Sequence, residues 1–271
     1  MEYRSELAVL MYHDIGPRSP NPQFRDFVVE PQLFAEHLAA LSDAGFVTEP
    51  VSRLCDLERS SSPELPVFIT FDDAYLSLVK NVMPSLTKHN MTATVFVPTA
   101  YVGGRAEWLD VIGEGGRRIL DWHDLRDMRA SGVEFGGHGH RHLQLDLLSS
   151  GRLASETEQS RAVLEDGLGE PIRTFAYPFG FHSRRVREEV RRCGYEVAFE
   201  VGDDLYTPSP DRHYSIKRIQ VGPDMEPDEL IAAIRRGRSS PLVRRARLRL
   251  GPALRIAQRQ RRKWGARSAV N

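Results

Sequence analysis

The chain has 271 residues, of which 41% are hydrophobic and 27% are charged, with 21 Gly and 17 Pro. This composition is globular and excludes collagen-like and wholly disordered chains, and the length suits one large α/β domain with an appendage. The net charge of zero hides an asymmetry: residues 1–230 carry 24 basic and 37 acidic residues, a net −13, whereas residues 231–271 carry 13 basic residues and no acidic one. Two cysteines, Cys55 and Cys193, exclude a disulfide scaffold.

No apolar run reaches the roughly 18 residues that a membrane-spanning helix needs. The run Leu7–Tyr12 follows Glu2, Arg4 and Glu6, and it lacks the length and the cleavage site of a signal peptide. We therefore expect a strand at this position. We also expect a cytoplasmic protein without a signal peptide or transmembrane helix, peripheral at most on the inner face of the membrane.

Apolar runs typical of buried strands alternate with segments of helical periodicity along the chain. At least six such steps predict an α/β fold with a parallel sheet, either an open doubly wound sheet or a barrel. Cys193 lies on the inward face of its predicted helix, so we expect it in the core. The predicted strands are 8–12, 67–71, 93–97, 133–135, 174–177, 197–201 and 216–221, and the predicted helices are 31–44, 77–89, 121–132, 153–168, 183–194 and 228–236.

Three polar motifs follow predicted strands: Asp72-Asp73, His138–His142 and Tyr177–Gly180. Each has an ordinary explanation when taken alone, as a helix N-cap, an exposed loop or a turn. In a barrel, however, the carboxyl ends of the strands converge on one site. Two buried carboxylates need a cation, imidazole is a common metal ligand, and an Asp-His-His set leaves a position open for water. Together the three motifs predict a catalytic metal site.

Thr70-Phe71-Asp72-Asp73, then His138-x-x-x-His142, then Tyr177-Pro178-Phe179-Gly180 resemble the motifs of the polysaccharide deacetylase family, which has the NodB-homology domain and is also called carbohydrate esterase family four. Tyr12-His13-Asp14-Ile15 is similar to the Tyr-His-x-Ile element of one branch of that family. The resemblance covers about residues 8–236. It implies a distorted (β/α) barrel with seven parallel strands. We therefore expect a catalytic domain over residues 1–237. An Arg-rich tail, helical or disordered, is expected over residues 238–271.

The resemblance also implies the roles of individual residues. Asp72 is the general base on a metal-bound water that attacks an amide carbonyl, His13 is the general acid, and the backbone N–H of Phe179 helps to hold the oxyanion. The metal is expected to be zinc, with cobalt, nickel, iron or manganese as alternatives. The implied metal ligands are Asp73, His138 and His142.

Four positions depart from the family pattern: Ala74 stands for Gly, Gly139 for Ser or Thr, Ala176 for Arg and Phe179 for Tyr. The missing Arg would orient the catalytic aspartate, and Arg218 is a candidate to supply its guanidinium, although a solvated edge position is the alternative. Tyr177 and His140 are expected beside the ligands, and an exposed position is the alternative for His140.

The basic tail has an apolar stripe over residues 241–264 with arginines around it, interrupted at Gly251-Pro252. It suits an amphipathic segment on an anionic membrane surface, and a solvated tail is the alternative. Nucleic-acid binding is not expected, because no fold for base readout precedes it.

The predicted function is that of a metal-dependent hydrolase that removes an N-acetyl or other short N-acyl group from an amino sugar of a glycan or glycolipid precursor. The predicted partner is an N-acetylated carbohydrate. The alternatives are a hydrolase of the same fold acting on a small cyclic amide or an O-acyl ester, and a non-catalytic glycan- or membrane-binding protein.

Overall fold

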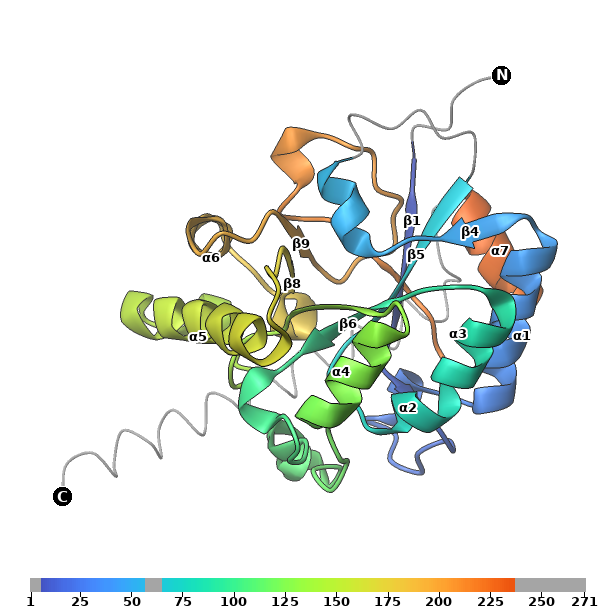
Figure 1. Cartoon of the computed structure of the whole chain (residues 1–271), viewed down its shortest axis with the longest axis horizontal. Coiled ribbons are helices and arrows are strands. Elements are labelled where there is room, and N and C mark those ends of the chain that lie inside the picture. The colour runs from blue at the N-terminus through green and yellow to red at the C-terminus, as the bar shows by residue number, and fades with distance from the viewer. Residues whose placement is uncertain (1–5, 57–64, 237–271) are drawn as a thin grey trace.

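Seven parallel strands run in continuous order across the main sheet of the computed structural model, which describes residues 6–56 and 65–236. The strands of this sheet are β1 (Ala8–Tyr12), β4 (Phe46–Thr48), β5 (Leu65–Phe71), β6 (Thr94–Val97), β7 (Glu134–Gly137), β8 (Thr174–Ala176), β9 (Val197–Phe199) and β10 (Ile219–Gln220). Their order is β10-β1-β5-β6-β7-β8-β9, and β4 pairs with the start of β5 as an eighth strand (Figure 1). Every pair is parallel, as the alternation of apolar runs and helices predicts.

One segment links the two edges of this sheet. Ile216 forms a parallel bridge with Phe199 of β9, and three residues later Ile219 of β10 pairs with Leu10 of β1. The sheet therefore curves back toward its first strand, whereas an open doubly wound sheet would leave its edges apart. The expected distorted (β/α) barrel with about seven strands is confirmed.

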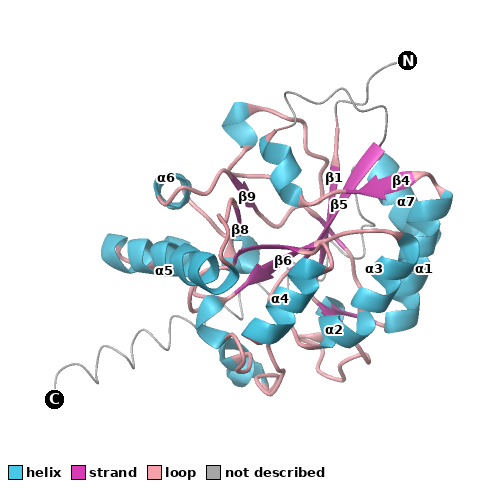
Figure 2. Cartoon of the chain, in the orientation of Figure 1, coloured by secondary structure: helices cyan, strands magenta, loops and turns pink. Residues whose placement is uncertain are grey.

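Helices surround the strands (Figure 2). Asp121 begins α4 with a capping box, in which its side chain accepts the backbone N–H groups of His123 and Asp124. The inward faces of α1 and α7 pack against each other. The helices are α1 (Pro31–Asp43), α2 (Ser77–Asn81), α3 (Met83–His89), α4 (Trp122–Ala130), α5 (Ser150–Leu168), α6 (Arg184–Arg192) and α7 (Pro227–Arg236).

The predicted helix over residues 77–89 is wrong as a single element. The chain forms α2 and α3, which meet at Val82. Pro84 lies in the first turn of α3, where its missing N–H costs nothing. In an uninterrupted helix the same proline would leave the carbonyl of Lys80 without a donor and its ring would clash there.

Other expectations need smaller corrections. A separate two-stranded sheet of β2 (Asp14–Ile15) and β3 (Val28–Val29) was not predicted, because two-residue strands carry no periodicity. Cys193 is half-buried at the C-cap of α6 instead of lying fully in the core, and its thiol lies 3.1 Å from the Thr157 hydroxyl.

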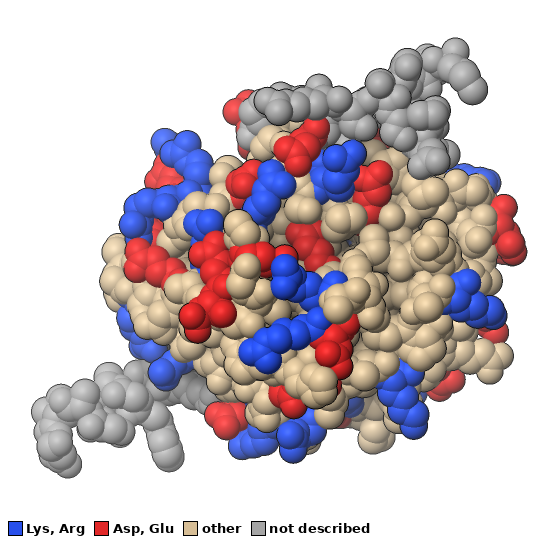
Figure 3. All heavy atoms as spheres, viewed as in Figure 1, with Lys and Arg blue, Asp and Glu red and all other residues tan. Residues whose placement is uncertain are grey.

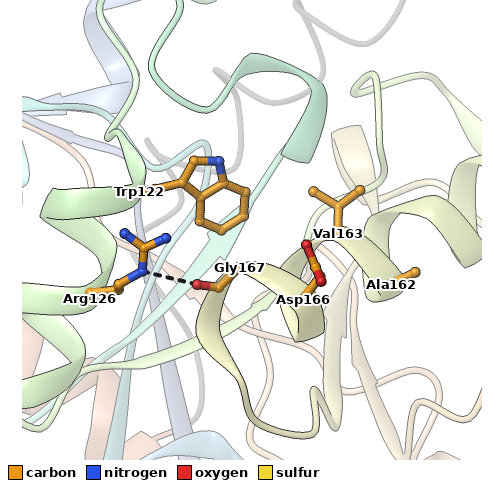
Figure 4. A pocket seen from close by; sticks show the side chains of 6 residues that line it. All are labelled: Trp122, Arg126, Ala162, Val163, Asp166 and Gly167. Atoms are coloured by element: carbon orange, nitrogen blue, oxygen red, sulfur yellow. Dashed lines mark hydrogen bonds between the residues drawn. The ribbon is translucent and has the colours of Figure 1, made fainter.

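The described surface has mixed charge, and a groove lies between two of its helices. Basic and acidic side chains are interspersed on the face shown in Figure 3. The groove lies between α4 and α5, where Arg126 Nε donates to the Gly167 carbonyl at 3.2 Å beside the Trp122 ring (Figure 4). None of the predicted site residues lines this groove. Within residues 6–56 and 65–236, no helix has the length and hydrophobicity to cross a membrane.

Candidate active site

The three polar motifs meet at the carboxyl ends of neighbouring strands. Asp72 and Asp73 follow β5, His138 follows β7, and Tyr177 follows β8. Because these strands are parallel and lie side by side, their ends open on the same edge of the barrel. The fold therefore brings together residues that lie more than a hundred positions apart in the chain.

Asp73, His138 and His142 form a buried group in which one ligand atom of each residue lies within 4.8 Å of the others. Asp73 Oδ1 is 3.1 Å from His142 Nε2 and 3.5 Å from His138 Nε2. Asp73 and His142 have positive φ angles of 74° and 50°, in the left-handed region that non-glycine residues rarely adopt. Such backbone geometry is common where a site requires a fixed side-chain direction.

The donor atoms of this group fit a divalent metal ion. Asp73 Oδ1 is buried and has no hydrogen-bond partner among the described residues. His138 Nδ1 lies 2.8 Å from the Ala176 carbonyl and must donate to it, so the Nε2 lone pair faces the cluster. Burial lowers the pKa of His138 to about 4, which keeps this imidazole neutral at neutral pH. One carboxylate and two imidazoles are a common ligand set for zinc and related metals.

Asp72 is held by the guanidinium of Arg218, the candidate for this role in the sequence. Arg218, which is fully buried, donates from Nη1 to Asp72 Oδ1 at 2.7 Å and from Nη2 to Asp72 Oδ2 at 2.8 Å. Burial alone would raise the pKa of Asp72, but Arg218, together with His138 and His13, outweighs burial, and the pKa lies below its usual value. The exposed-edge alternative for Arg218 is therefore excluded.

His13 lies at the same end of the barrel, after β1. Its Nε2 is 3.9 Å from Asp72 Oδ2, and its side chain is 15% exposed. The ring of Phe27 packs edge-on against it, with ring centroids 4.8 Å apart. Burial lowers the pKa of His13, and Asp72 and Asp73 oppose this shift without reversing it. The His13 imidazole therefore lies close enough to Asp72 to exchange a proton with a substrate group bound beside this aspartate.

The turn Pro178–Gly180 packs against the loop His138–His142, which we call the ligand loop. The Phe179 ring contacts the His142 ring with centroids 4.6 Å apart, and Phe179 has a positive φ of 63°. Tyr177, which was expected beside the ligands, instead donates its hydroxyl to the Tyr214 carbonyl at 3.0 Å. Its side chain therefore stabilises the barrel, and its hydroxyl bonds to a residue outside the Asp-His-His group.

His140 lies outside the metal-type cluster, as expected. Its Nδ1 pairs with the Thr99 hydroxyl at 2.9 Å. The ligand loop is tied by Glu156 of α5, whose carboxylate accepts the Arg141 N–H at 2.8 Å and whose carbonyl accepts the His140 N–H at 3.2 Å. The role of Glu156 was not predicted from the sequence, although an acidic residue beside the inward helix face was an available signal.

Tyr75 is a second residue that sequence analysis missed. Its buried hydroxyl donates to Asp73 Oδ2 at 2.8 Å, which leaves Asp73 Oδ1 facing the two imidazoles. The Trp108 ring stacks beside the His142 ring at 4.6 Å and closes another side. Neither contact is visible in the sequence, because both depend on where the loops after the strands fold back.

A buried carboxylate and two imidazoles beside an arginine-held aspartate, at the strand ends of a (β/α) barrel, define a hydrolase site of the metal-binding class. A family model described as "Polysaccharide deacetylase" matches residues 59–198. The chain belongs to this family, whose members hydrolyse carbon–nitrogen bonds and are generally metal-dependent.

Individual relatives agree with this assignment. The chain is 25% identical over 218 residues to the poly-beta-1,6-N-acetyl-D-glucosamine N-deacetylase of Staphylococcus aureus, covering 76% of this chain and 72% of that protein. The structure of IcaB from Ammonifex degensii is similar with a TM-score of 0.70 and 28% identity, covering 84% of this chain and 97% of that one. The Streptococcus pyogenes deacetylase PplD in complex with acetate shares the fold, with a TM-score of 0.72 at 24% identity over 84% of this chain and 98% of that one.

Proposed function

We propose that this protein removes N-acetyl groups from amino sugars of a glycan by metal-dependent hydrolysis. The observation that carries the proposal is the Arg218–Asp72 pair beside the cluster of Asp73, His138 and His142, with His13 at the edge of the same site. Amide hydrolysis needs a base, an acid and charge stabilisation at the carbonyl oxygen, and this arrangement offers a candidate for each. The activity of the Staphylococcus aureus relative, a poly-beta-1,6-N-acetyl-D-glucosamine N-deacetylase, supports an N-acetylated polysaccharide as the substrate class.

In this proposal Asp73, His138 and His142 hold a divalent ion, with zinc as the first candidate. Such an ion polarises a carbonyl and makes a bound water more acidic. Tyr75 occupies the second carboxylate oxygen of Asp73, so only Oδ1 is left to face the ion.

Asp72 accepts the proton of the attacking water. Arg218 holds both oxygens of Asp72 in place and keeps the carboxylate ionised. His13, whose Nε2 lies 3.9 Å from Asp72, protonates the departing amine. The backbone N–H of Phe179, in the turn beside His142, donates a hydrogen bond to the oxyanion.

Acetate release tests the proposal. Metal-loaded protein is assayed with soluble oligomers of N-acetylglucosamine, and an O-acetyl ester and a small cyclic amide are assayed in parallel. Asp72→Asn and His13→Ala should each lower kcat by at least about 100-fold while metal content stays unchanged. Turnover of only the ester or the cyclic amide would contradict the substrate assignment. Full activity of His13→Ala would transfer the acid role to another residue.

The remaining expectations are part of the same proposal. We place the catalytic domain at residues 1–237, because α7 packs on α1 and ends at Arg236. The tail over residues 238–271 lies outside the described residues, and its 11 basic side chains without an acidic one favour an anionic membrane surface. Co-sedimentation of full-length and truncated protein with anionic vesicles at low salt tests this idea. Failure of the full-length chain to sediment would contradict it. The cytoplasmic location stays a prediction.

A further inference from the structure

The side chain of His182 is only 8% exposed. Arg187 of α6 donates from Nη1 to His182 Nδ1 at 3.0 Å, and His182 Nε2 lies 2.5 Å from a carboxylate oxygen of Glu200. Because arginine can only donate, Nδ1 is the acceptor and Nε2 carries the proton. His182 therefore donates to Glu200, and its ring stacks on the Tyr177 ring with centroids 4.5 Å apart.

His182 follows the turn Pro178–Gly180 by two residues, and that turn is pinned on two sides. On one side the Phe179 ring contacts the imidazole of His142. On the other side Gly180, with a φ of +72°, lies so close to Val201 that an added Cβ would sit 2.4 Å from the valine Cβ. The turn thus bridges the ligand loop and the segment that follows β9.

Glu200 joins this turn to the base. Its side chain holds His182, while its backbone carbonyl accepts a hydrogen bond from Arg218 Nε at 3.3 Å. Arg218 in turn holds both oxygens of Asp72. One residue after β9 therefore contacts both the segment that carries the turn and the arginine that orients Asp72.

We propose that His182 is a positioning residue that, through Glu200, fixes the turn carrying the Phe179 N–H relative to Asp72. The inference rests on the proposed function, because it assigns the turn to the oxyanion. A donor that must meet a developing charge is effective only when it is held in place before the reaction. We call the hydrogen bond between His182 and Glu200 the latch. Loss of the latch should therefore lower kcat and leave both KM and metal binding nearly unchanged.

The kinetic test uses full-length, metal-loaded protein and soluble oligomers of N-acetylglucosamine. His182→Leu should lower kcat by about 10- to 100-fold, the range for groups that orient a site. His182→Gln, whose amide can still donate to Glu200, should retain most of the wild-type kcat. His123→Leu is the matched control, because His123 is 80% exposed on α4. A kcat within about twofold of wild type for His182→Leu overturns the proposal.

Glu200→Ala removes the acceptor in place of the donor, keeps the backbone carbonyl that binds Arg218, and provides the test if His182→Leu fails to fold. It should reproduce the loss in kcat, and in a folded double variant the two losses should not add, because both remove one interaction. Additive losses would contradict the latch.

A measurement independent of turnover separates the two proposals. Long-range ¹H–¹⁵N NMR of the full-length chain should show His182 with a protonated Nε2 and an unprotonated Nδ1, and Glu200→Ala should change this signal. A wild-type protein without acetate release would overturn the proposed function, whereas the NMR result still tests the latch. An Nδ1–H tautomer with an unprotonated Nε2 would overturn the latch.

Discussion

Arg218 lies 146 residues after Asp72 in the chain and binds both of its oxygens. The structural reason lies in the closure of the barrel: the segment that pairs with β1 brings Arg218 beside the end of β5. This arrangement supplies the guanidinium that was expected from the sequence to hold Asp72 in the absence of an arginine at Ala176.

The Arg218–Asp72 pair predicts a change in the pH dependence of activity. Arg218 stabilises the ionised form of Asp72, so the pKa of Asp72 is lowered and the base works at acidic pH. In Arg218→Met, the largest of the contributions that oppose burial is lost, so the pKa of Asp72 should rise. The acidic limb of the kcat/KM profile should therefore move to higher pH. Arg218→Lys keeps the charge but loses the bidentate contact, so its limb should move less. An unmoved limb in Arg218→Met would show that Asp72 is not the titrating base.

The metal-type cluster predicts which histidine variants lose metal. Asp73→Ala, His138→Ala and His142→Ala should each abolish stoichiometric metal binding, because each removes one of three ligands. His140→Ala should keep most of the metal, since its Nδ1 pairs with Thr99. Metal analysis after dialysis, together with competition against a chelator, measures both effects. Loss of metal in the His140 variant alone would contradict the ligand assignment.

At the scale of elements, α5 supports the loop between His138 and His142. Glu156 is 6% exposed and accepts the Arg141 N–H, and its carbonyl accepts the His140 N–H. The N–H groups of Thr99 and Ala100 hold the same loop from the other side, by donating to the carbonyls of Gly139 and His140. A loop held from both sides keeps His142 in its left-handed conformation.

This support predicts that Glu156→Ala weakens metal binding by about 10- to 100-fold, because the loop loses a side-chain acceptor. Glu156→Gln keeps an amide oxygen as acceptor and should stay close to wild type. Asp166→Ala on the exposed face of α5 is the control, because Asp166 belongs to neither group of possible metal ligands. Metal affinity from chelator competition is the measurement. Equal affinities for Glu156→Ala and wild type would contradict the role of α5.

At the scale of the whole molecule, the last helix completes the barrel. Leu230, Ala233 and Ile234 of α7 are buried, and α7 packs on α1. His37 of α1 also contacts the Met225 carbonyl, through Nε2 at 2.7 Å. These contacts tie the end of the described chain to its beginning, so the folded unit extends through α7.

Truncation after Gly237 should therefore leave a single cooperative thermal transition with a Tm within a few degrees of the full chain. Truncation after Glu226 removes α7 and exposes the apolar face of α1, so it should destabilise the fold by several kcal/mol. Thermal unfolding followed by circular dichroism compares the three chains. A Tm for residues 1–237 as low as that of the shorter chain would place the domain boundary within the tail.

The sequence by itself predicted most of the strands and helices in their order, and it singled out the three residues that the structure brings together as a possible metal site. Apolar runs and helical periodicity report burial on one face, and this local signal predicted β1, β5, β6 and most of the helices. The motifs around Asp73 and His138 were visible because ligands at the ends of strands stand out from an apolar background. In a parallel barrel the carboxyl ends of the strands lie on one face, so a prediction of this fold also predicts that the motifs at the strand ends meet.

Only the tertiary structure decided which side chains meet across the site. The choice between a clamping and a solvated Arg218, the tie from Glu156, and the burial of His182 depend on contacts between segments far apart in the chain. No local period encodes such contacts, because the free energy of placing a polar side chain depends on the partner that packing brings to it. The break between α2 and α3 was readable at Pro84, whereas the latch at Glu200 becomes visible only once β9 and the turn after β8 lie side by side.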